Sequence, residues 1–206
     1  MDNNIPSMAP EAQLPEETSI LVIGCGPTGA LLSVLLTRLR VDFICLDKSP
    51  SIAEDPRGIA LDEDGIRALQ AAGIYESIFT EIGSCAGTFG FISGSHNDLF
   101  SKPFLQMDLD STEGGTGHPA IVFQKQPVME RKLRERIAEG ALRTGCTLIG
   151  IDEDEVGVSA KYVDSNGIER VVRSKFLVGA DGKTGFVRKN YLEPKGVSVE
   201  PISMKG

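Results

Sequence analysis

The residues best suited to chemistry form a glycine-rich segment near the N-terminus. Gly24, Gly26 and Gly29 are spaced as GxGxxG within Gly24-Cys-Gly-Pro-Thr-Gly29, so Pro27 and Thr28 belong to the same candidate binding segment. The first glycine allows a tight turn, the second leaves room for a pyrophosphate beside the backbone, and the third lets a helix approach a strand. Backbone amides and the positive end of a helix dipole then bind phosphate.

The neighbouring elements place this turn between a strand and a helix. The apolar run Ser19–Gly24 predicts a buried parallel strand, and Pro27–Arg40 predicts a helix with proline in its first turn. A second strand, Val41–Asp47, ends in an acid 18 positions after Gly29. Asp47 is expected to accept a hydrogen bond from a ribose hydroxyl, with Lys48 beside it. A Rossmann-like unit without a ligand is the alternative, and the motif alone does not separate NAD from FAD.

The next segment gives the first specific resemblance. A loop rich in turn formers leads to Asp62, which predicts a helix N-cap, and Gly73 predicts the end of that helix. The segment 55–73, from Asp-Pro-Arg-Gly-Ile-Ala onward, resembles the corresponding part of single-component FAD-dependent aromatic hydroxylases, such as the phenol and 3-(3-hydroxyphenyl)propionate hydroxylases. The resemblance implies that Arg57 lies beside the flavin. By residue type alone, Arg57 is a solvated loop arginine.

A second helix carries a similar motif. Apolar residues four apart predict a helix that opens at Pro127 and ends at Gly145; they are Met129, Leu133, Ile137 and Ala141. Its start resembles the Q-P-x-x-E-x-x-L helix of the hydroxylases, whose glutamine bonds the cofactor. The resemblance therefore implies that Gln126 binds the cofactor. The alternative for Gln126 is a simple polar residue at a helix N-terminus.

The segment Phe176–Arg188 is similar to the Asp-Gly motif of the same hydroxylases. An apolar strand delivers Asp181 and Gly182 at its carboxyl end, where open α/β sheets bind ligands. The resemblance implies that Asp181, Gly182 and Arg188 contact FAD and the passing nicotinamide cofactor. Gly185 is a departure, because the family usually has serine there. We expect the loss of that hydroxyl to loosen the turn.

The remaining pattern predicts an α/β chain. Ser165-Asn-Gly167 is a turn signal, and Ala86–Ser93 with Asp98–Phe104 predict strands or a hairpin on the substrate side. Further strands are predicted at Ala120–Phe123, Cys146–Ile151, Val156–Val163, Ile168–Val172 and Phe176–Gly179. The resemblance implies a Rossmann-like fold of the glutathione-reductase type, with a parallel central sheet and a small antiparallel β element, truncated relative to the family. We expect a flexible leader at 1–17, an FAD-binding domain at 18–195 with a partial substrate-side insertion at 85–120, and a C-terminal tail at 196–206.

The function implied by the resemblance is an NAD(P)H-dependent monooxygenase. FAD would be the cofactor, NADPH or NADH the reductant, and an aromatic or polyketide-like small molecule and oxygen the partners. No residue here is identified as the catalytic base. Family members continue into a second flavin motif, a Gly-Asp stretch that this chain lacks, so the chain is interpreted as the FAD-binding portion or a shortened relative.

Two other hypotheses for the function stay open. The first is a shortened flavin-fold protein with a non-redox role, such as an isomerase or cyclase in secondary metabolism, or a passive binding module. The second, an NAD-dependent dehydrogenase, is disfavoured by the Asp-Gly segment.

Composition limits the class of partner. The 206 residues carry 29 acidic and 21 basic side chains, a formal charge of −8, so neither nucleic acid nor anionic membrane is an expected partner. No run approaches the ~20 apolar residues of a spanning helix. The four cysteines form no CxxC pair, which favours free thiols in a reducing cytoplasm; they are Cys25, Cys45, Cys85 and Cys146. A homo-oligomer is left open.

No metal site is expected. His96 and His118 have no partners at ligand spacing. The acidic run Asp152–Glu155 is accompanied by no other oxygen-ligand motif, so we expect a solvated loop.

Overall fold

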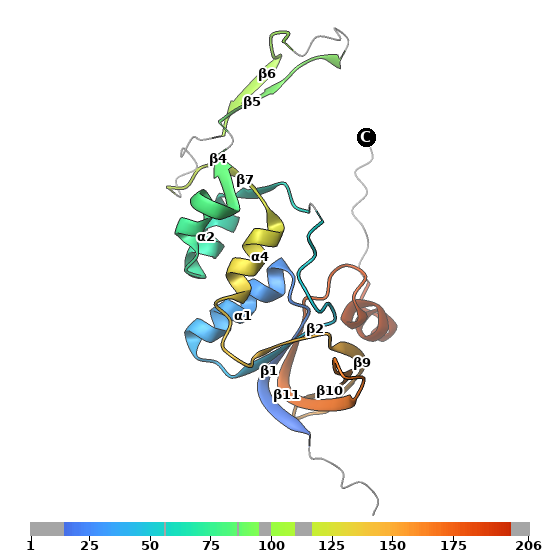
Figure 1. Cartoon of the computed structure of the whole chain (residues 1–206). Helices are drawn as coiled ribbons and strands as arrows, with labels where there is room; N and C mark the ends of the chain where they lie inside the picture. Colours follow the sequence, from blue (N-terminus) through green and yellow to red (C-terminus); the bar gives the residue numbers. More distant parts are fainter. Residues whose placement is uncertain (1–14, 56, 86, 95–99, 110–116, 199–206) are drawn as a thin grey trace, which may run out of the picture.

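The computed structural model describes residues 15–55, 57–85, 87–94, 100–109 and 117–198. Its main sheet has six strands in the order β8-β2-β1-β11-β10-β9 (Figure 1). The first four strands run parallel to their neighbours, and β10 and β9 extend the sheet antiparallel. This arrangement confirms the α/β fold class. The strands are β1 (Glu16–Ile23), β2 (Phe43–Asp47), β8 (Leu142–Thr144), β9 (Thr147–Glu153), β10 (Val158–Val163) and β11 (Glu169–Gly179).

The predicted strand–turn–helix–strand unit at the start of the chain is confirmed. β1 pairs with β2 on one side and β11 on the other, so its apolar residues are buried on both faces; Leu21 and Val22 are fully buried. Helix α1 (Pro27–Leu39) has proline in its first turn and ends at Arg40, which adopts a left-handed conformation with φ of 56°. The turn between β1 and α1 therefore lies at the carboxyl end of an inner strand of the sheet, directly before the start of the helix.

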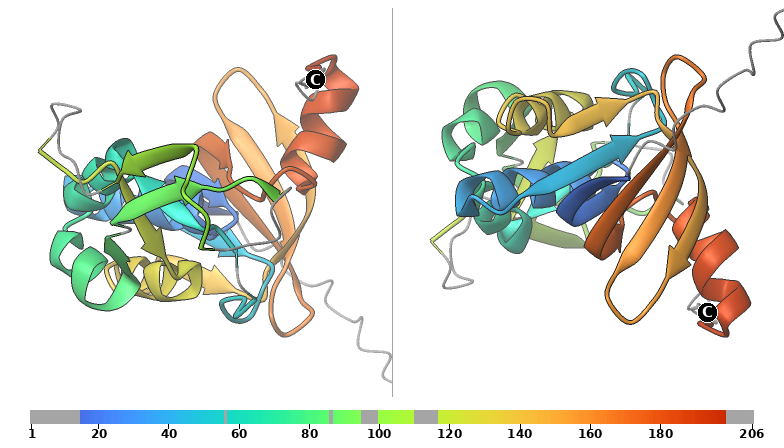
Figure 2. Two further views of the ribbon diagram at one scale, coloured as in Figure 1. Left: turned by 90° about the horizontal axis from the view of Figure 1, so that it is seen from above. Right: turned by 90° about the horizontal axis from the view of Figure 1, so that it is seen from below.

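Helices pack mainly on one face of this sheet (Figure 2). They are α1, α2 (Glu63–Ala71), α3 (Tyr75–Ser77), the π-helix η1 (Ile78–Ile82) and α4 (Gln126–Arg134). The opposite face carries a second apolar cluster, against which Val187 of the π-helix η3 (Val187–Leu192) packs; the short 3-10 helix η4 (Glu193–Lys195) follows. The sheet is thus covered on both sides near the carboxyl ends of its parallel strands.

Helix α2 begins and ends as the sequence predicts. The side chain of Asp62 accepts a hydrogen bond from the amide of Gly65 at 2.8 Å, so it is the predicted N-cap. Ile66 and Leu69 are buried on the face that meets the core, and Gly73 follows the helix with φ of 82°. Short-range signals were sufficient for the two ends because the cap hydrogen bond and the glycine that ends the helix are local to it.

Two smaller antiparallel sheets extend from the helical layer. One has the order β3-β7-β4, formed by β3 (Ala60–Asp62), β7 (Ile121–Gln124) and β4 (Gly83–Cys85). The other is a hairpin of β5 (Thr88–Phe91) and β6 (Leu105–Asp108), which projects away from the rest of the molecule (Figure 1). The predicted strand Ala120–Phe123 corresponds to β7.

The helix predicted to run to Gly145 ends eleven residues earlier than expected, at Arg134. Ile137 and Ala141 do pack against the core, but from turns, and Gly140 has a positive φ of 77°. The chain then forms β8, a strand that the sequence analysis did not predict, beside β2. An apolar spacing of four therefore marked a buried face without marking a continuous helix.

Several strand boundaries also differ from the prediction. The second strand of the hairpin is Leu105–Asp108, so the prediction of a strand at Asp98–Phe104 is wrong; residues 100–104 are not in a strand, and 98–99 lie outside the described residues. The two strands predicted at Ile168–Val172 and Phe176–Gly179 are one continuous strand, β11. It is continuous because its pairing with β10 passes directly into its pairing with β1.

Part of the expected leader and part of the acidic run belong to strands of the main sheet. β1 starts at Glu16, within the segment expected as a leader, and Arg143 donates two hydrogen bonds to the Glu16 carboxylate. Residues 1–14 and 199–206 lie outside the described residues. Asp152 and Glu153 belong to β9 rather than to a loop, and each pairs with a lysine. No helix among the described residues is long and apolar enough to cross a membrane.

Candidate nucleotide-binding site

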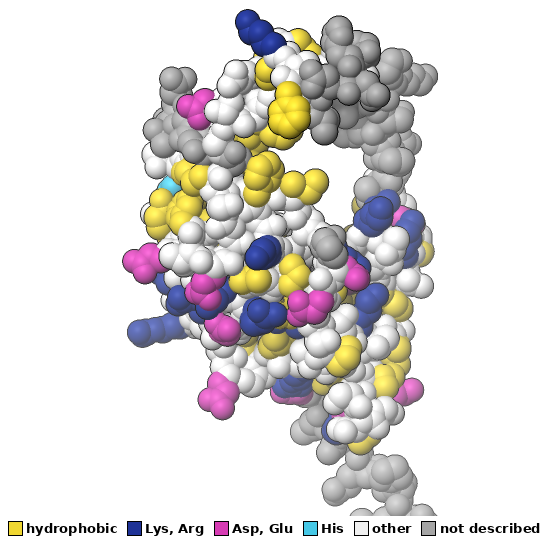
Figure 3. Space-filling model, turned by 45° about the horizontal axis from the view of Figure 1, so that its top comes forward, with side chains coloured by type: hydrophobic (Ala, Val, Ile, Leu, Met, Phe, Trp, Pro, Cys, Tyr) yellow, Lys and Arg dark blue, Asp and Glu magenta, His cyan; other side chains and the backbone are white. Residues whose placement is uncertain are grey.

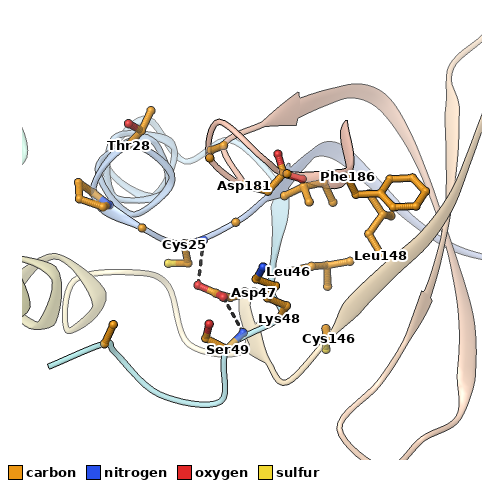
Figure 4. A pocket seen from close by; sticks show the side chains of 18 of the residues that line it. Cys25, Thr28, Leu46, Asp47, Lys48, Ser49, Cys146, Leu148, Asp181 and Phe186 are labelled. Atoms are coloured by element: carbon orange, nitrogen blue, oxygen red, sulfur yellow. Dashed lines mark hydrogen bonds between the residues drawn. The ribbon is translucent and has the colours of Figure 1, made fainter. Parts of the chain in front are cut away.

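A pocket of about 580 Å³ lies at the carboxyl ends of β1, β2 and β11, beside the start of α1 (Figure 4). This edge is where ligands bind in open α/β sheets. The structure brings most of the predicted binding residues to its walls; they are Gly24, Gly26, Pro27, Thr28, Asp47, Lys48, Arg57, Gln126, Asp181 and Gly182. Gly29 and Arg188 do not line it. The sequence analysis did not identify the opposite wall, which includes Cys146, Thr147, Leu148 and Phe186.

The three glycines of the turn meet three different surroundings. A Cβ on Gly24 would lie 2.6 Å from the carbonyl oxygen of Ala180, and its φ is +94°. A Cβ on Gly29 would lie 1.9 Å from the carbonyl oxygen of Gly24. Packing of the protein itself therefore requires both glycines. A Cβ on Gly26 would meet nothing within 4 Å, so the space beside Gly26 is open to a ligand.

The start of α1 is suited to an anion. Its N-cap, Gly26, makes no side-chain capping hydrogen bond, and the first turn contains no acidic residue. The first amides of a helix have no partner within the helix, and they form the positive end of its dipole. Together with the open space beside Gly26, these amides fit a phosphate group.

Asp47 lies directly beside this turn and is hydrogen-bonded to it (Figure 4). Its Oδ2 accepts a hydrogen bond from the amide of Cys25 at 3.0 Å, and its Oδ1 accepts one from the amide of Ser49 at 2.8 Å. Asp47 is therefore held by the glycine turn on one side and by the end of β2 on the other. Its carboxylate is fixed before any ligand arrives.

Arg134, which the sequence analysis missed, completes this network. Its Nη2 donates to Oδ2 of Asp47 at 2.8 Å and to the carbonyl oxygen of Cys25 at 2.7 Å. Both side chains are nearly buried, with 12% of Arg134 and 9% of Asp47 exposed. The only signal in the sequence was an arginine directly after Leu133 on the Q-P-x-x-E-x-x-L helix. Its partner is 87 positions away and becomes its neighbour only when α4 packs on α1.

Gln126 and Arg57 line another part of the pocket. Gln126 donates from Nε2 to the buried Glu130 at 2.7 Å, one turn further along α4. The exposed Arg57 pairs with Asp55 at 3.7 Å. Gly58 has φ of +65°, and a Cβ there would lie 2.9 Å from Oε1 of Gln126, so the loop and the helix are in close contact. The structure thus places Arg57 and Gln126 in the same pocket.

The Asp-Gly segment explains the departure at position 185. Oδ2 of Asp181 accepts a hydrogen bond from the amide of Val187 at 3.0 Å. A Cβ on Gly185 would lie only 2.1 Å from the carboxyl carbon of Asp181. The carboxylate thus fills the space of a residue-185 side chain and bonds the start of η3; the loosened turn stays a prediction. Arg188 does not line the pocket, and its Nε donates a hydrogen bond to the Glu193 carboxylate at 3.0 Å.

A thiol pair lies beneath the glycine turn. Cys25 and Cys45 are both fully buried, and all four cysteines are free. The hydrogen bond between the two thiols and their burial raise the pKa of Cys25. The Cys25 thiol therefore stays neutral and places no negative charge beside the anion site.

Metal binding finds no support in the described part of the chain. No group of three or more His, Cys, Asp or Glu side chains there could hold a metal ion. His118 is buried against Tyr75, with ring centroids 5.4 Å apart, and His96 lies outside the described residues. Asp154 of the acidic run pairs with Arg173.

Comparison with known proteins gives one family and a consistent set of relatives. The family described as "FAD binding domain" matches residues 17–198. The 3-(3-hydroxy-phenyl)propionate/3-hydroxycinnamic acid hydroxylase of Comamonas testosteroni is 29% identical over 176 residues, 84% of this chain and 29% of the relative. The probable NADH-specific resorcinol 4-hydroxylase of Rhodococcus jostii (strain RHA1) is 28% identical over 174 residues, 82% of this chain and 32% of the relative. The chain spans about a third of the length of these relatives.

Solved structures give the same fold. RebC, soaked with chromopyrrolic acid and with 7-carboxy-K252c bound, superposes with a TM-score of 0.76 at 20% identity, over 92% of this chain and 36% of that one. The p-nitrophenol 4-monooxygenase PnpA of Pseudomonas putida DLL-E4 gives 0.75 at 21% identity, over 84% of this chain and 43% of that one. The resemblance expected from the glycine turn, the helix after Gln126 and the Asp-Gly segment is confirmed by the family match. The chain belongs to the FAD binding domain family.

Proposed function

We propose that this chain binds FAD in the pocket at the carboxyl ends of β1, β2 and β11, as the cofactor-binding part of an NAD(P)H-dependent monooxygenase of aromatic small molecules. The observation that carries the proposal is the open space beside Gly26, next to the uncapped start of α1 and to Asp47, which is hydrogen-bonded to the same turn. The names of the relatives, which are hydroxylases of phenolic compounds, support the substrate class.

The residues present fit the cofactor's adenosine diphosphate half. The amides at the start of α1 would bind the diphosphate, because no described residue occupies the space beside Gly26. Asp47 would accept a ribose hydroxyl, with Lys48 at the same rim of the pocket. Thr147 and Leu148 on β9 form the opposite wall, where a base can lie.

The other predicted residues would hold the flavin half. Arg57, Gln126, Asp181 and Gly182 line the same pocket. When bound, FAD supplies the redox chemistry, taking a hydride from the nicotinamide and passing electrons to oxygen. The described residues orient the cofactor and exclude water from its buried side. Arg188, held by Glu193 outside the pocket, keeps only a role at the nicotinamide's approach in this proposal. With four free thiols, a reducing cytoplasmic location belongs to the same proposal.

The experiment is a titration of the purified chain with FAD. We expect a flavin absorption band that remains with the protein after gel filtration, and stoichiometric quenching or enhancement of flavin fluorescence. The variant Gly26→Val should lose this binding and keep its melting temperature, because the new side chain fills only ligand space. Gly94→Val is the matched control, because a Cβ on Gly94 also meets nothing within 4 Å and Gly94 does not line the pocket.

The activity is tested separately. NADH or NADPH oxidation is followed with resorcinol or 3-(3-hydroxyphenyl)propionate, and the hydroxylated product is identified by mass spectrometry. FAD binding without any such product would contradict the monooxygenase assignment and leave the cofactor site standing. A protein that stays colourless with excess FAD would contradict both, and favour a non-redox role for the fold.

A further inference from the structure

The carboxylate of Asp47 has little free hydrogen-bonding capacity. A carboxylate accepts about four hydrogen bonds, two on each oxygen. Oδ2 of Asp47 already accepts from the amide of Cys25 and from Nη2 of Arg134, and Oδ1 accepts from the amide of Ser49. Among the described residues, one acceptor position is left, and it belongs to Oδ1.

The guanidinium of Arg134 is held firmly on the other oxygen. The two protons of its Nη2 are both used, one on Oδ2 of Asp47 at 2.8 Å and one on the carbonyl oxygen of Cys25 at 2.7 Å. Hydrogen bonds between charged groups are stronger than neutral ones, and this pair is shielded from water. The Nε of Arg134 is buried without an acceptor among the described residues, so the two Nη2 bonds set where the group lies.

We propose that Arg134 is a positioning residue that sets how the pocket recognises ribose. By filling Oδ2 of Asp47 together with the Cys25 amide, Arg134 leaves the acid able to accept one ribose hydroxyl through Oδ1, and not two. The ligand class is an adenine nucleotide with a diphosphate, so the inference rests on the proposed function. It adds a residue, and a limit on recognition, that the glycine turn and the acid alone do not supply.

The chemistry of arginine explains why this position suits no other cation. One planar terminal nitrogen donates to two acceptors, a carboxylate and a carbonyl, which lie on different segments of the chain. A lysine ammonium is a compact, strongly hydrated charge on a flexible stem and holds such a geometry poorly. The arginine therefore ties the β1–α1 turn to the end of β2, and both face the nucleotide.

The test uses three probes on the purified full chain: ADP, 2′-deoxy-ADP and 3′-deoxy-ADP. Affinities are measured by isothermal titration calorimetry, or by competition with FAD fluorescence if the binding of ADP is weak. We expect that removal of one hydroxyl lowers affinity about tenfold to hundredfold, as for a lost hydrogen bond to a charged group. Removal of the other should change affinity by less than about twofold. Equal losses for both hydroxyls, or no loss for either, would overturn the proposal.

Variants assign the effect to Arg134. Arg134→Met frees a position on Oδ2, so affinity should become sensitive to the second hydroxyl, a change that a merely structural role would not produce. Arg134→Lys should show the same change in weaker form, and serves if the methionine variant does not fold. The matched control is Arg131→Met on the same helix, whose exposed side chain pairs with Glu54 at 3.2 Å outside the pocket.

The outcomes for the two proposals are distinguishable. If the wild-type chain binds neither ADP nor FAD, the proposed function fails and this inference fails with it. If it binds both nucleotides but Arg134→Met keeps the wild-type hydroxyl preference, only the role of Arg134 is refuted. Thermal unfolding of each variant, followed by circular dichroism, shows that a lost affinity is not a lost fold.

Discussion

The nucleotide pocket and the β5–β6 hairpin are built on opposite principles. At the pocket, Asp47, Arg134 and the Cys25 peptide are nearly buried and joined by hydrogen bonds from three separate segments. On the hairpin, every residue of both strands is exposed, and the aromatic rings contact mainly one another. Figure 3 shows hydrophobic side chains on the surface at this end of the molecule. The exposed fraction is 73% for Phe104 and 49% for Leu105.

This difference separates what the chain stabilises by itself from what it does not. Within the protein, Asp47 accepts three hydrogen bonds and Nη2 of Arg134 donates two, so this part of the site is preformed and its geometry resists change. A two-stranded hairpin with little other support is marginally stable in water. We therefore expect substitutions near the pocket to change folding and binding strongly, and substitutions on the hairpin to change neither.

The largest effect is expected for Gly29→Val. Its Cβ would lie 1.9 Å from a backbone oxygen of Gly24, which cannot move without displacing the turn. We expect a loss of on the order of 4 kcal/mol or more in the free energy of unfolding, measured by urea denaturation. The control is Gly26→Val, which meets open space three residues earlier. Equal stability of the two variants would contradict the packing role of Gly29.

A matched pair of leucines compares the two regions directly. Leu133→Ala removes a fully buried side chain next to Arg134, and should cost about 2–5 kcal/mol of unfolding free energy. Leu105→Ala makes the same change on the hairpin, where about half of the side chain is exposed, and should cost less than about 1 kcal/mol. A similar loss for both leucines would show that the hairpin is packed as firmly as the core.

A smaller effect on stability is expected for the exposed ion pair between Asp154 and Arg173, in contrast to the buried pair between Asp47 and Arg134. The Arg173 guanidinium and the amides of Val156 and Gly157 lower the pKa of Asp154 to about 2. Because the folded pKa lies below the unfolded value of about 3.9, the stabilisation is present above pH 4 and is lost as pH falls toward 2.

This pH dependence is measured by thermal unfolding between pH 2 and pH 6. Asp154→Asn should lower the melting temperature at pH 6 and flatten its decline toward pH 2. Asp152→Asn is the control, because Asp152 pairs with Lys161 only at 3.8 Å on the surface. A wild-type curve that declines no more steeply than that of Asp154→Asn would refute the role of this carboxylate.

The smallest effect on stability is expected for an exposed aromatic side chain of the hairpin region. Phe104→Ser removes an exposed ring whose centroid lies 6.3 Å from that of the Phe91 ring. The substitution should change the unfolding free energy by no more than about 0.5 kcal/mol. FAD affinity should be unchanged, because the hairpin does not line the pocket. A large loss of stability would mean that the hairpin contributes to the core of the molecule.

Prediction from the sequence succeeded where the signal was local. The glycine turn, the buried run of β1 and the cap at Asp62 each depend on residues within a few positions of one another. Prediction failed where contacts with distant segments of the chain determine the local structure. The apolar spacing after Leu133 continued to Ala141, yet the helix ends at Arg134 because the chain must turn back to form β8 beside β2.

The sequence by itself determined the family, the strand–turn–helix–strand unit and ten of the residues that line the pocket. Only the tertiary structure decided that Arg134 bonds Asp47, that Asp181 fills the space beside Gly185, and that Arg188 lies outside the pocket. The reason is physical. Turn formation and apolar burial are properties of short segments, whereas the partner of a charged side chain depends on which helix packs against which strand.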